Sequence, residues 1–214
     1  MADKNTELKS NVKDIAKTVL VLLIIACVSG GLLGCINAIT YMSDEEILQK
    51  KISKFYEAES FINLQTTEDT EYANLNAKVK ALNETEKKGF DTTALLPVKN
   101  GAVEQGKVVY RVYGSGDYDC TLLILITNNK IEQVAVYSSS ATPGIGDKAY
   151  KPAHIDKYKN IDILNVDASK LAVAKKPTNS NEIESVAGAT KSSTAVNNAI
   201  VTAIKLHQSL FKEG

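Results

Sequence analysis

Residues 184–193 read Glu-Ser-Val-Ala-Gly-Ala-Thr-Lys-Ser-Ser and mark the point where an irregular segment gives way to a predicted helix. Gly188 and Ala189 carry almost no side chain, so a bulky group can approach the backbone there. The free N–H groups and positive dipole of a helix start form an anion site, usually for phosphate. A cap without a ligand is the alternative interpretation. Three hydroxyl residues lie at this start: Thr190, Ser192 and Ser193.

This stretch resembles the flavinylation motif of FMN-binding domains, Gly-Ala-Thr-x-Ser-Ser, with an acidic residue six positions before the threonine. The family includes the G subunit of the Rnf complex and the C subunit of the sodium-pumping NADH:quinone oxidoreductase. Its threonine carries FMN through a phosphoester bond, and the matching residue here is Thr190. The chain departs from the family pattern at Glu184, where Asp is usual, and at Ala187, where Ser or Thr is usual.

A second stretch, residues 142–148, reads Thr-Pro-Gly-Ile-Gly-Asp-Lys. Pro143 and Gly144 predict a type II turn, because Pro fixes its own φ and Gly accepts the positive φ that follows. Such a loop leaves Ile145 free to project, although a plain connecting turn is the simpler interpretation. The stretch is similar to the family's second motif, which lies against the isoalloxazine ring and usually begins with an acidic residue or Gln in place of Ala141.

Two motifs in this order, about fifty residues apart, are far more specific than either alone. The resemblance implies one covalent FMN per chain, joined to Thr190. It covers residues 108–211, including the glycine-rich first hairpin loop with Gly114 and Gly116, and the N-terminal span. The other expected cofactor-binding residues are Gly188, Ala189, Ser192, Ser193, Thr142, Gly144, Ile145 and Gly146.

The N-terminal segment predicts a membrane anchor, because no charged residue occurs from residue 18 to residue 43. As a helix this run would be roughly 39 Å long, enough for a hydrocarbon core of about 30 Å. A cleaved signal peptide is one alternative. A lipoprotein is another, since residues 32–35 loosely resemble a lipobox that would place a lipid on Cys35. All three interpretations place the remaining chain outside the cytoplasm.

Residues 44–94 are expected to be helical, because apolar residues recur at three- and four-residue spacing between charged ones. An antiparallel meander is predicted next, with strands near 108–113, 120–127 and 130–138. The middle strand is a nearly continuous apolar run, so both of its faces should be covered. Residues 192–211 predict a helix with this buried stripe: Val196, Ala199, Ile200, Ala203, Leu206 and Leu210. His207 beside the stripe is expected to be packed rather than a ligand.

The formal net charge of zero gives no indication of a nucleic-acid partner. The three cysteines and two histidines have no metal-ligand spacing, so no metal site is expected. No acid–base pair or triad is visible, and no catalytic residue is assigned. The electron chemistry would belong to the cofactor.

The predicted fold class is α+β. It comprises a cytoplasmic N-terminus at 1–17, a transmembrane helix at 18–40, a helical stalk or start of the domain at 41–100, and an FMN-binding domain at 101–214 with an antiparallel sheet packed by helices.

The resemblance implies an electron-transfer subunit of an Rnf-type oxidoreductase complex. The complex passes electrons between ferredoxin and NAD, coupled to Na⁺ or H⁺ movement, and the subunit is not catalytic by itself. Other membrane subunits and a flavin transferase are the implied partners. The implied location is the cell (inner or cytoplasmic) membrane, with a single span and the C-terminal domain on the extracytoplasmic side. The alternatives are the C-type subunit of the quinone reductase, an extracytoplasmic flavin-binding sensory or binding module, and a scaffolding lipoprotein without flavin.

Overall fold

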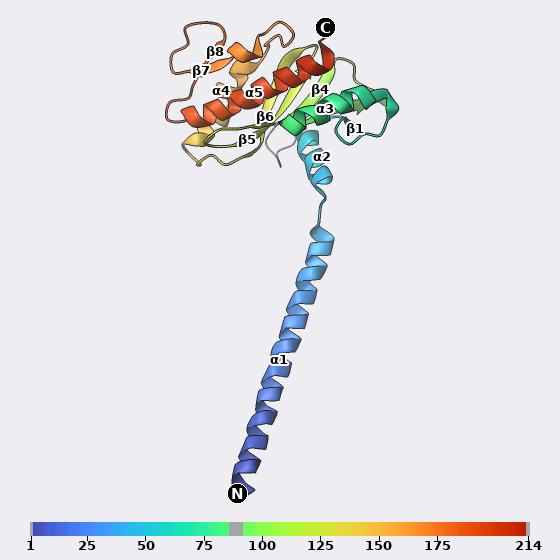
Figure 1. Ribbon diagram of the computed structural model, residues 1–214, viewed down its shortest axis with the longest axis vertical. Helices are drawn as coiled ribbons and strands as arrows, with labels where there is room; N and C mark the ends of the chain where they lie inside the picture. The colour runs from blue at the N-terminus through green and yellow to red at the C-terminus, as the bar shows by residue number, and fades with distance from the viewer. Residues whose placement is uncertain (1, 86–91, 213–214) are drawn as a thin grey trace. The chain divides into compact units, whose positions relative to one another are not determined.

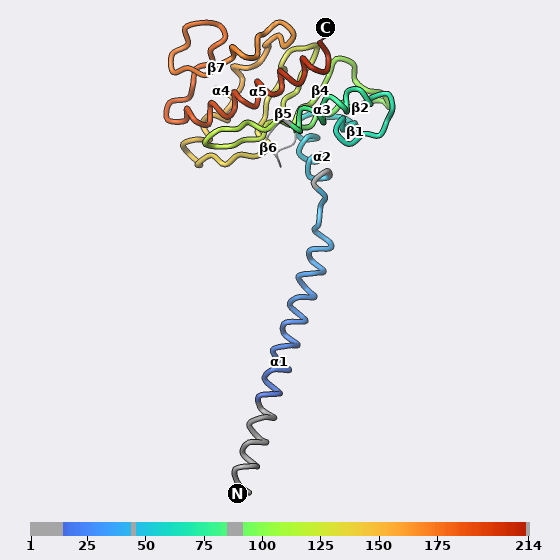
Figure 2. The backbone as a smooth tube through the Cα atoms, in the orientation of Figure 1, coloured from blue at the N-terminus to red at the C-terminus, as the bar shows by residue number. Residues whose placement is uncertain are grey.

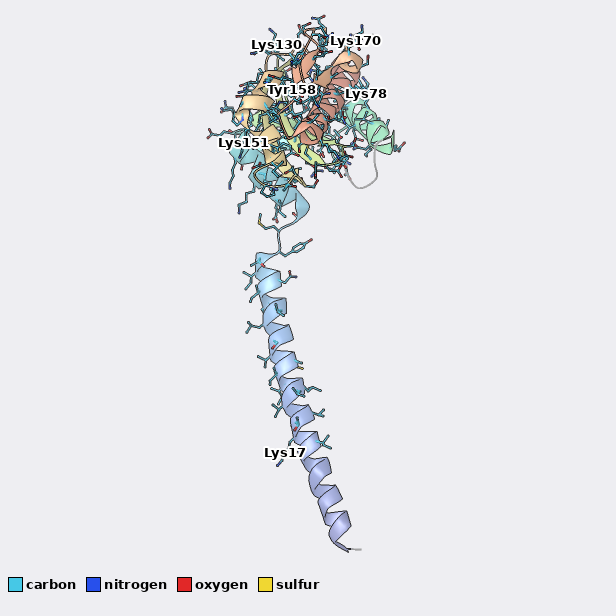
Figure 3. The ribbon with its side chains drawn as sticks, turned by 90° about the vertical axis from the view of Figure 1, so that its left-hand side faces the viewer. Lys17, Lys78, Lys130, Lys151, Tyr158 and Lys170 are labelled. Atoms are coloured by element: carbon cyan, nitrogen blue, oxygen red, sulfur yellow. The ribbon has the colours of Figure 1, made fainter. Side chains whose placement is uncertain are left out.

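The computed structural model describes residues 2–85 and 92–212, and the chain divides into two units, Met1–Ile47 and Leu48–Gly214. In the first unit, α1 (Ala2–Thr40) is one long helix (Figures 1 and 2). Its segment Ile15–Thr40 reaches a mean hydropathy of 2.8, and none of that apolar window is buried in the protein. Figure 3 labels Lys17 near the start of this segment. The helix is long and apolar enough to cross a membrane, which fits a single-pass anchor.

An antiparallel sheet with the strand order β1-β2-β4-β5-β6 forms the centre of the second unit, and β3 also pairs with β2. The predicted meander is confirmed, since β4, β5 and β6 are neighbours in both sequence and space. The α+β fold class is confirmed with it. The strands are β1 (Ser60–Asn63), β2 (Thr93–Lys99), β3 (Ala102–Val103), β4 (Lys107–Gly114), β5 (Cys120–Thr127) and β6 (Lys130–Ser139).

The two faces of β5 point into two separate apolar clusters, as its sequence predicted. Leu122 and Ile124 lie in a cluster with α5 (Thr190–Phe211), which crosses the sheet in Figure 1. Leu123 and Leu125 lie in the other cluster, with Ile52 of α2 (Asp44–Phe55). Because α5 packs along one face, its first turn is held at the edge of the sheet near the β4–β5 loop.

The helical interpretation of residues 44–94 is right for α2 and α3 (Ala73–Thr85) but wrong for the residues of β1 and the start of β2. β1 pairs with β2, so this part of the chain extends the sheet rather than forming a stalk by itself. The first five residues of β2 are all buried, which removes the polar alternation that identifies a strand in sequence.

Short elements connect β6 to α5. They are η2 (Gly146–Tyr150), α4 (Pro152–Ile155), η3 (Asp156–Tyr158), η4 (Ala168–Lys170) and the parallel strands β7 (Ala172–Ala174) and β8 (Glu182–Glu184), while η1 (Thr70–Tyr72) precedes α3. Tyr158, labelled in Figure 3, is fully buried.

α5 begins at Thr190, two residues before its predicted start, and its whole predicted apolar stripe is buried. His207 is also buried, as expected of a packed residue. Its Nδ1 lies 2.9 Å from the Tyr110 hydroxyl and its Nε2 lies 2.9 Å from Asn129 Oδ1.

Candidate functional site

Two glycine turns, more than forty residues apart in the sequence, face one pocket. In the first, the Ile145 N–H donates to the Thr142 carbonyl over 3.3 Å, and Gly144 has a φ of +78°. In the second, the Ala189 N–H donates to the Val186 carbonyl over 2.9 Å, and Gly188 has a φ of +77°. A type II turn needs positive φ at its third residue, so the turn predicted at Pro143-Gly144 is confirmed.

The pocket has a volume of about 320 Å³. Seven of the nine residues predicted to bind the cofactor line it, whereas Gly144 and Ser193 do not. Tyr118 and Lys191 complete the lining. The lining residues are Tyr118, Thr142, Ile145, Gly146, Gly188, Ala189, Thr190, Lys191 and Ser192.

The start of α5 has no side-chain cap, which contradicts the interpretation of this stretch as a Ser/Thr helix cap. Ala189 holds the N-cap position, and the first bond of the helix runs from the Ser193 N–H to the Ala189 carbonyl over 2.9 Å. The N–H groups of the three residues before Ser193 therefore have no acceptor within the helix. Since the pocket lies at this end of a 22-residue helix, it receives the positive end of the dipole.

Thr190 is the first residue of α5 and is exposed at the pocket. The sequence had placed it in an open segment before the helix, and this boundary is corrected. The glycine turn that ends at Ala189 lies directly before it. Glu184, the acidic residue of the motif, is exposed, and its Oε2 accepts a hydrogen bond from Lys157 Nζ at 3.1 Å.

Ser192 and Ser193 are both buried but have different roles. The Ser193 hydroxyl donates to the Ala189 carbonyl over 3.0 Å and accepts from the Val186 N–H over 3.1 Å. These two hydrogen bonds stabilise the glycine turn between Val186 and Ala189. Ser192 lines the pocket, and its buried Oγ completes no hydrogen bond. A buried hydroxyl without a partner is costly, typically by about 1–3 kcal/mol, and a ligand in the pocket would remove that cost.

Two side chains at the pocket were not assigned from the sequence. Tyr118 lies in the β4–β5 loop, where the sequence indicated only a turn. Among the described residues of the second unit, Tyr118 and Ile145 are the exposed large hydrophobic side chains, with 37% and 57% of their surfaces accessible. Lys191 Nζ forms an ion pair with Asp117 Oδ2 at 2.8 Å, and this contact raises the pKa of Lys191. The ion pair joins the first turn of α5 to the same loop.

Comparison with known proteins gives one family match. Residues 115–205 match the model of the FMN-binding domain, and this range contains every residue that lines the pocket. A search of curated protein sequences finds no significant match. Among solved structures, the chain is similar to the crystal structure of Shewanella oneidensis NqrC, with 20% sequence identity, a TM-score of 0.48, and coverage of 80% of this chain and 88% of that one.

Proposed function

We propose that the pocket at the start of α5 holds one FMN, joined through its phosphate to the Thr190 hydroxyl, because residues 115–205 match the model of the FMN-binding domain. One observation carries the proposal. The uncapped start of a long helix opens into a pocket, and the first residue of that helix presents an exposed hydroxyl. A phosphate linked there would meet the free N–H groups where the dipole favours negative charge.

The remaining pocket residues suit the other parts of FMN. The exposed apolar surfaces of Tyr118 and Ile145 would be covered by the flavin ring, which removes them from water. Gly188 and Gly146 leave room near the backbone for the phosphate and the chain that joins it to the ring. Thr142 and Ala189 complete this lining, while Gly144 and Ser193 would support the site by shaping its two turns.

Attachment would use FAD as the donor on a separate flavin transferase. Thr190 Oγ attacks the phosphorus on the flavin side of the pyrophosphate, the bond between that phosphorus and the bridging oxygen breaks, and AMP leaves. The threonine proton passes to a base on the transferase. The product is a phosphodiester that leaves the flavin ring unmodified, and bound FMN supplies the electron-transfer chemistry.

The wider role that we propose is an electron-transfer subunit of an Rnf-type membrane complex, which moves electrons between ferredoxin and NAD with Na⁺ or H⁺ transport. The apolar segment of α1 supports membrane attachment, and the domain would lie on the extracytoplasmic side. The C-type subunit of the sodium-pumping quinone reductase is the second candidate, because it is a member of the family whose model residues 115–205 match. Purification of the native complex and identification of its subunits would distinguish the two.

Intact-mass measurement of the full chain, produced with and without a flavin transferase, tests the attachment. The wild type should gain the mass of one FMN less one water, on the peptide containing Thr190. Thr190→Ala should stay folded and colourless. Thr194→Ala is the matched control, since this exposed threonine lies one turn further along α5 and should leave the adduct in place. An adduct that persists in Thr190→Ala, or one found on Ser192 or Ser193, would rule the assignment out.

A further inference from the structure

Beneath the pocket, two buried hydroxyl groups from different elements approach each other. Ser192 lines the pocket and is 1% exposed. The Tyr150 hydroxyl, at the end of η2, is also buried, and neither hydroxyl has a partner in hydrogen-bond geometry. The Tyr150 hydroxyl lies close enough to Ser192, Ser139 and Cys120 for all three side chains to affect its pKa. A hydroxyl has one proton to donate and two lone pairs to accept, so each group lacks what the other could supply.

We propose that Tyr150 is a positioning residue that donates its hydroxyl proton to Ser192 Oγ, so that the Ser192 proton is directed at an anion in the pocket. The inference rests on the proposed function, because the anion is the FMN phosphate. It goes further in assigning a role to a tyrosine that does not line the pocket. Without the tyrosine, the Ser192 proton has no fixed direction.

The backbone around this pair supports the assignment. A Cβ on Gly146 would fall 2.8 Å from Ser192 Oγ, so the first residue of η2 lies against this hydroxyl. The last residue of η2, Tyr150, is the one whose pKa the same hydroxyl affects. The serine oxygen is therefore confined between the two ends of one short element.

The acidity of Tyr150 fits a permanent donor. Burial, together with the nearby Cys120 thiol, raises the pKa of Tyr150 to about 12, even though the Ser192 and Ser139 hydroxyls act to lower it. The tyrosine therefore keeps its proton at every physiological pH.

Binding of inorganic phosphate to the unloaded full chain in detergent tests the inference. Phosphate affinity would be followed by the amide NMR shifts of Lys191 and Ser192. We expect Tyr150→Phe to weaken binding about fivefold, as for one hydrogen bond of about 1 kcal/mol, and Ser192→Ala to weaken it at least as much. Because Tyr150 acts through Ser192, the double variant should bind phosphate no more weakly than Ser192→Ala. Tyr158→Phe is the control, since it removes a buried tyrosine hydroxyl that donates to Asn197 and not to the pocket.

Each result has a defined meaning. If Tyr150→Phe binds phosphate as the wild type does, or still weakens binding when Ser192 is already alanine, the positioning role is overturned while the flavin assignment stands. If the wild type binds no phosphate and its intact mass shows no FMN, the proposed function and this inference both fail. In the FMN-loaded protein, the ³¹P resonance should move in the same direction in Tyr150→Phe and in Ser192→Ala. An unchanged resonance in Tyr150→Phe would also overturn the role.

Discussion

A methyl group on Gly114 would lie 2.0 Å from the carbonyl oxygen of Ala195 and 2.9 Å from the Cβ of Ala199. The end of β4 and the second turn of α5 are therefore in direct backbone contact. Since the pocket is built on the first turn of the same helix, this contact sets where the Thr190 end of α5 lies relative to the β4–β5 loop.

Gly114→Ala should push α5 away from the sheet and destabilise the second unit by about 1–3 kcal/mol, the usual range for overpacking. The chain has no Trp, so denaturant unfolding is followed by circular dichroism. Gly116→Ala is the graded control, because its Cβ would meet Ala195 Cβ at 3.2 Å, a much milder contact. An equal loss of unfolding free energy in the two variants would show that α5 can shift at this point without a cost in stability.

The two glycines of the Thr142–Asp147 loop should respond differently to alanine. A Cβ on Gly144 meets nothing within 4 Å, so Gly144→Ala costs only the strain of a positive φ, about 1–2 kcal/mol. A Cβ on Gly146 meets both Ser192 Oγ and Ala141 Cβ at 2.8 and 2.9 Å. Gly146→Ala should therefore displace Ser192 and reduce the flavin bound per chain, measured by visible absorbance, more than Gly144→Ala does. A greater flavin loss in Gly144→Ala would contradict this order.

The sequence identified the pocket well because its two turns depend on local chemistry. The positive φ of Gly144 was predicted from Pro143-Gly144. At Gly188 the sequence indicated only small side chains, and the positive φ of this turn was found in the structure. Helix α5 was also predicted from the sequence, because its apolar residues recur with the helical period.

Other features depend on contacts that no local pattern reveals. Ser192 and Ser193 are adjacent hydroxyls, and their roles differ because a helix turns about 100° per residue, which sends one toward the pocket and the other toward Val186. Tyr118 reaches the pocket only because β4 and β5 end beside α5. The strand nature of residues 93–99 is hidden because both faces are buried.

The proposed topology can be tested by thiol labelling of intact cells. Lys176→Cys, in the exposed loop between β7 and β8, should react with a membrane-impermeant maleimide added outside, whereas Lys4→Cys should react only after lysis. The native thiols give little background. Cys27 and Cys35 lie in the apolar segment, and burial of Cys120 raises the pKa of its thiol to about 12, which keeps it unreactive. Labelling of Lys4→Cys in intact cells would indicate the opposite orientation. A mature N-terminus found at Cys35 would favour the lipoprotein.

Stability in acid should depend on His207, whose pKa is lowered by burial to about 4. The unfolded chain binds a proton near pH 6.5 while the folded chain does not, so the free energy of unfolding falls as the pH drops from about 6.5 to about 4. At about 1.4 kcal/mol for each pKa unit, the total loss is about 3 kcal/mol. Protonation would also force the Tyr110 hydroxyl, which now donates to Nδ1, to become an acceptor.

The matched variant is His207→Gln, which keeps a polar side chain but does not titrate. The unfolding free energy of the wild type minus that of His207→Gln should decrease by about 3 kcal/mol between pH 7 and pH 4, because all other titrating groups cancel in the difference. Below pH 4 the difference should level off, since both states of the wild type are then protonated at this site. A difference that stays constant from pH 7 to pH 4 would show that His207 titrates normally in the folded chain and that its contacts with Tyr110 and Asn129 tolerate the charge.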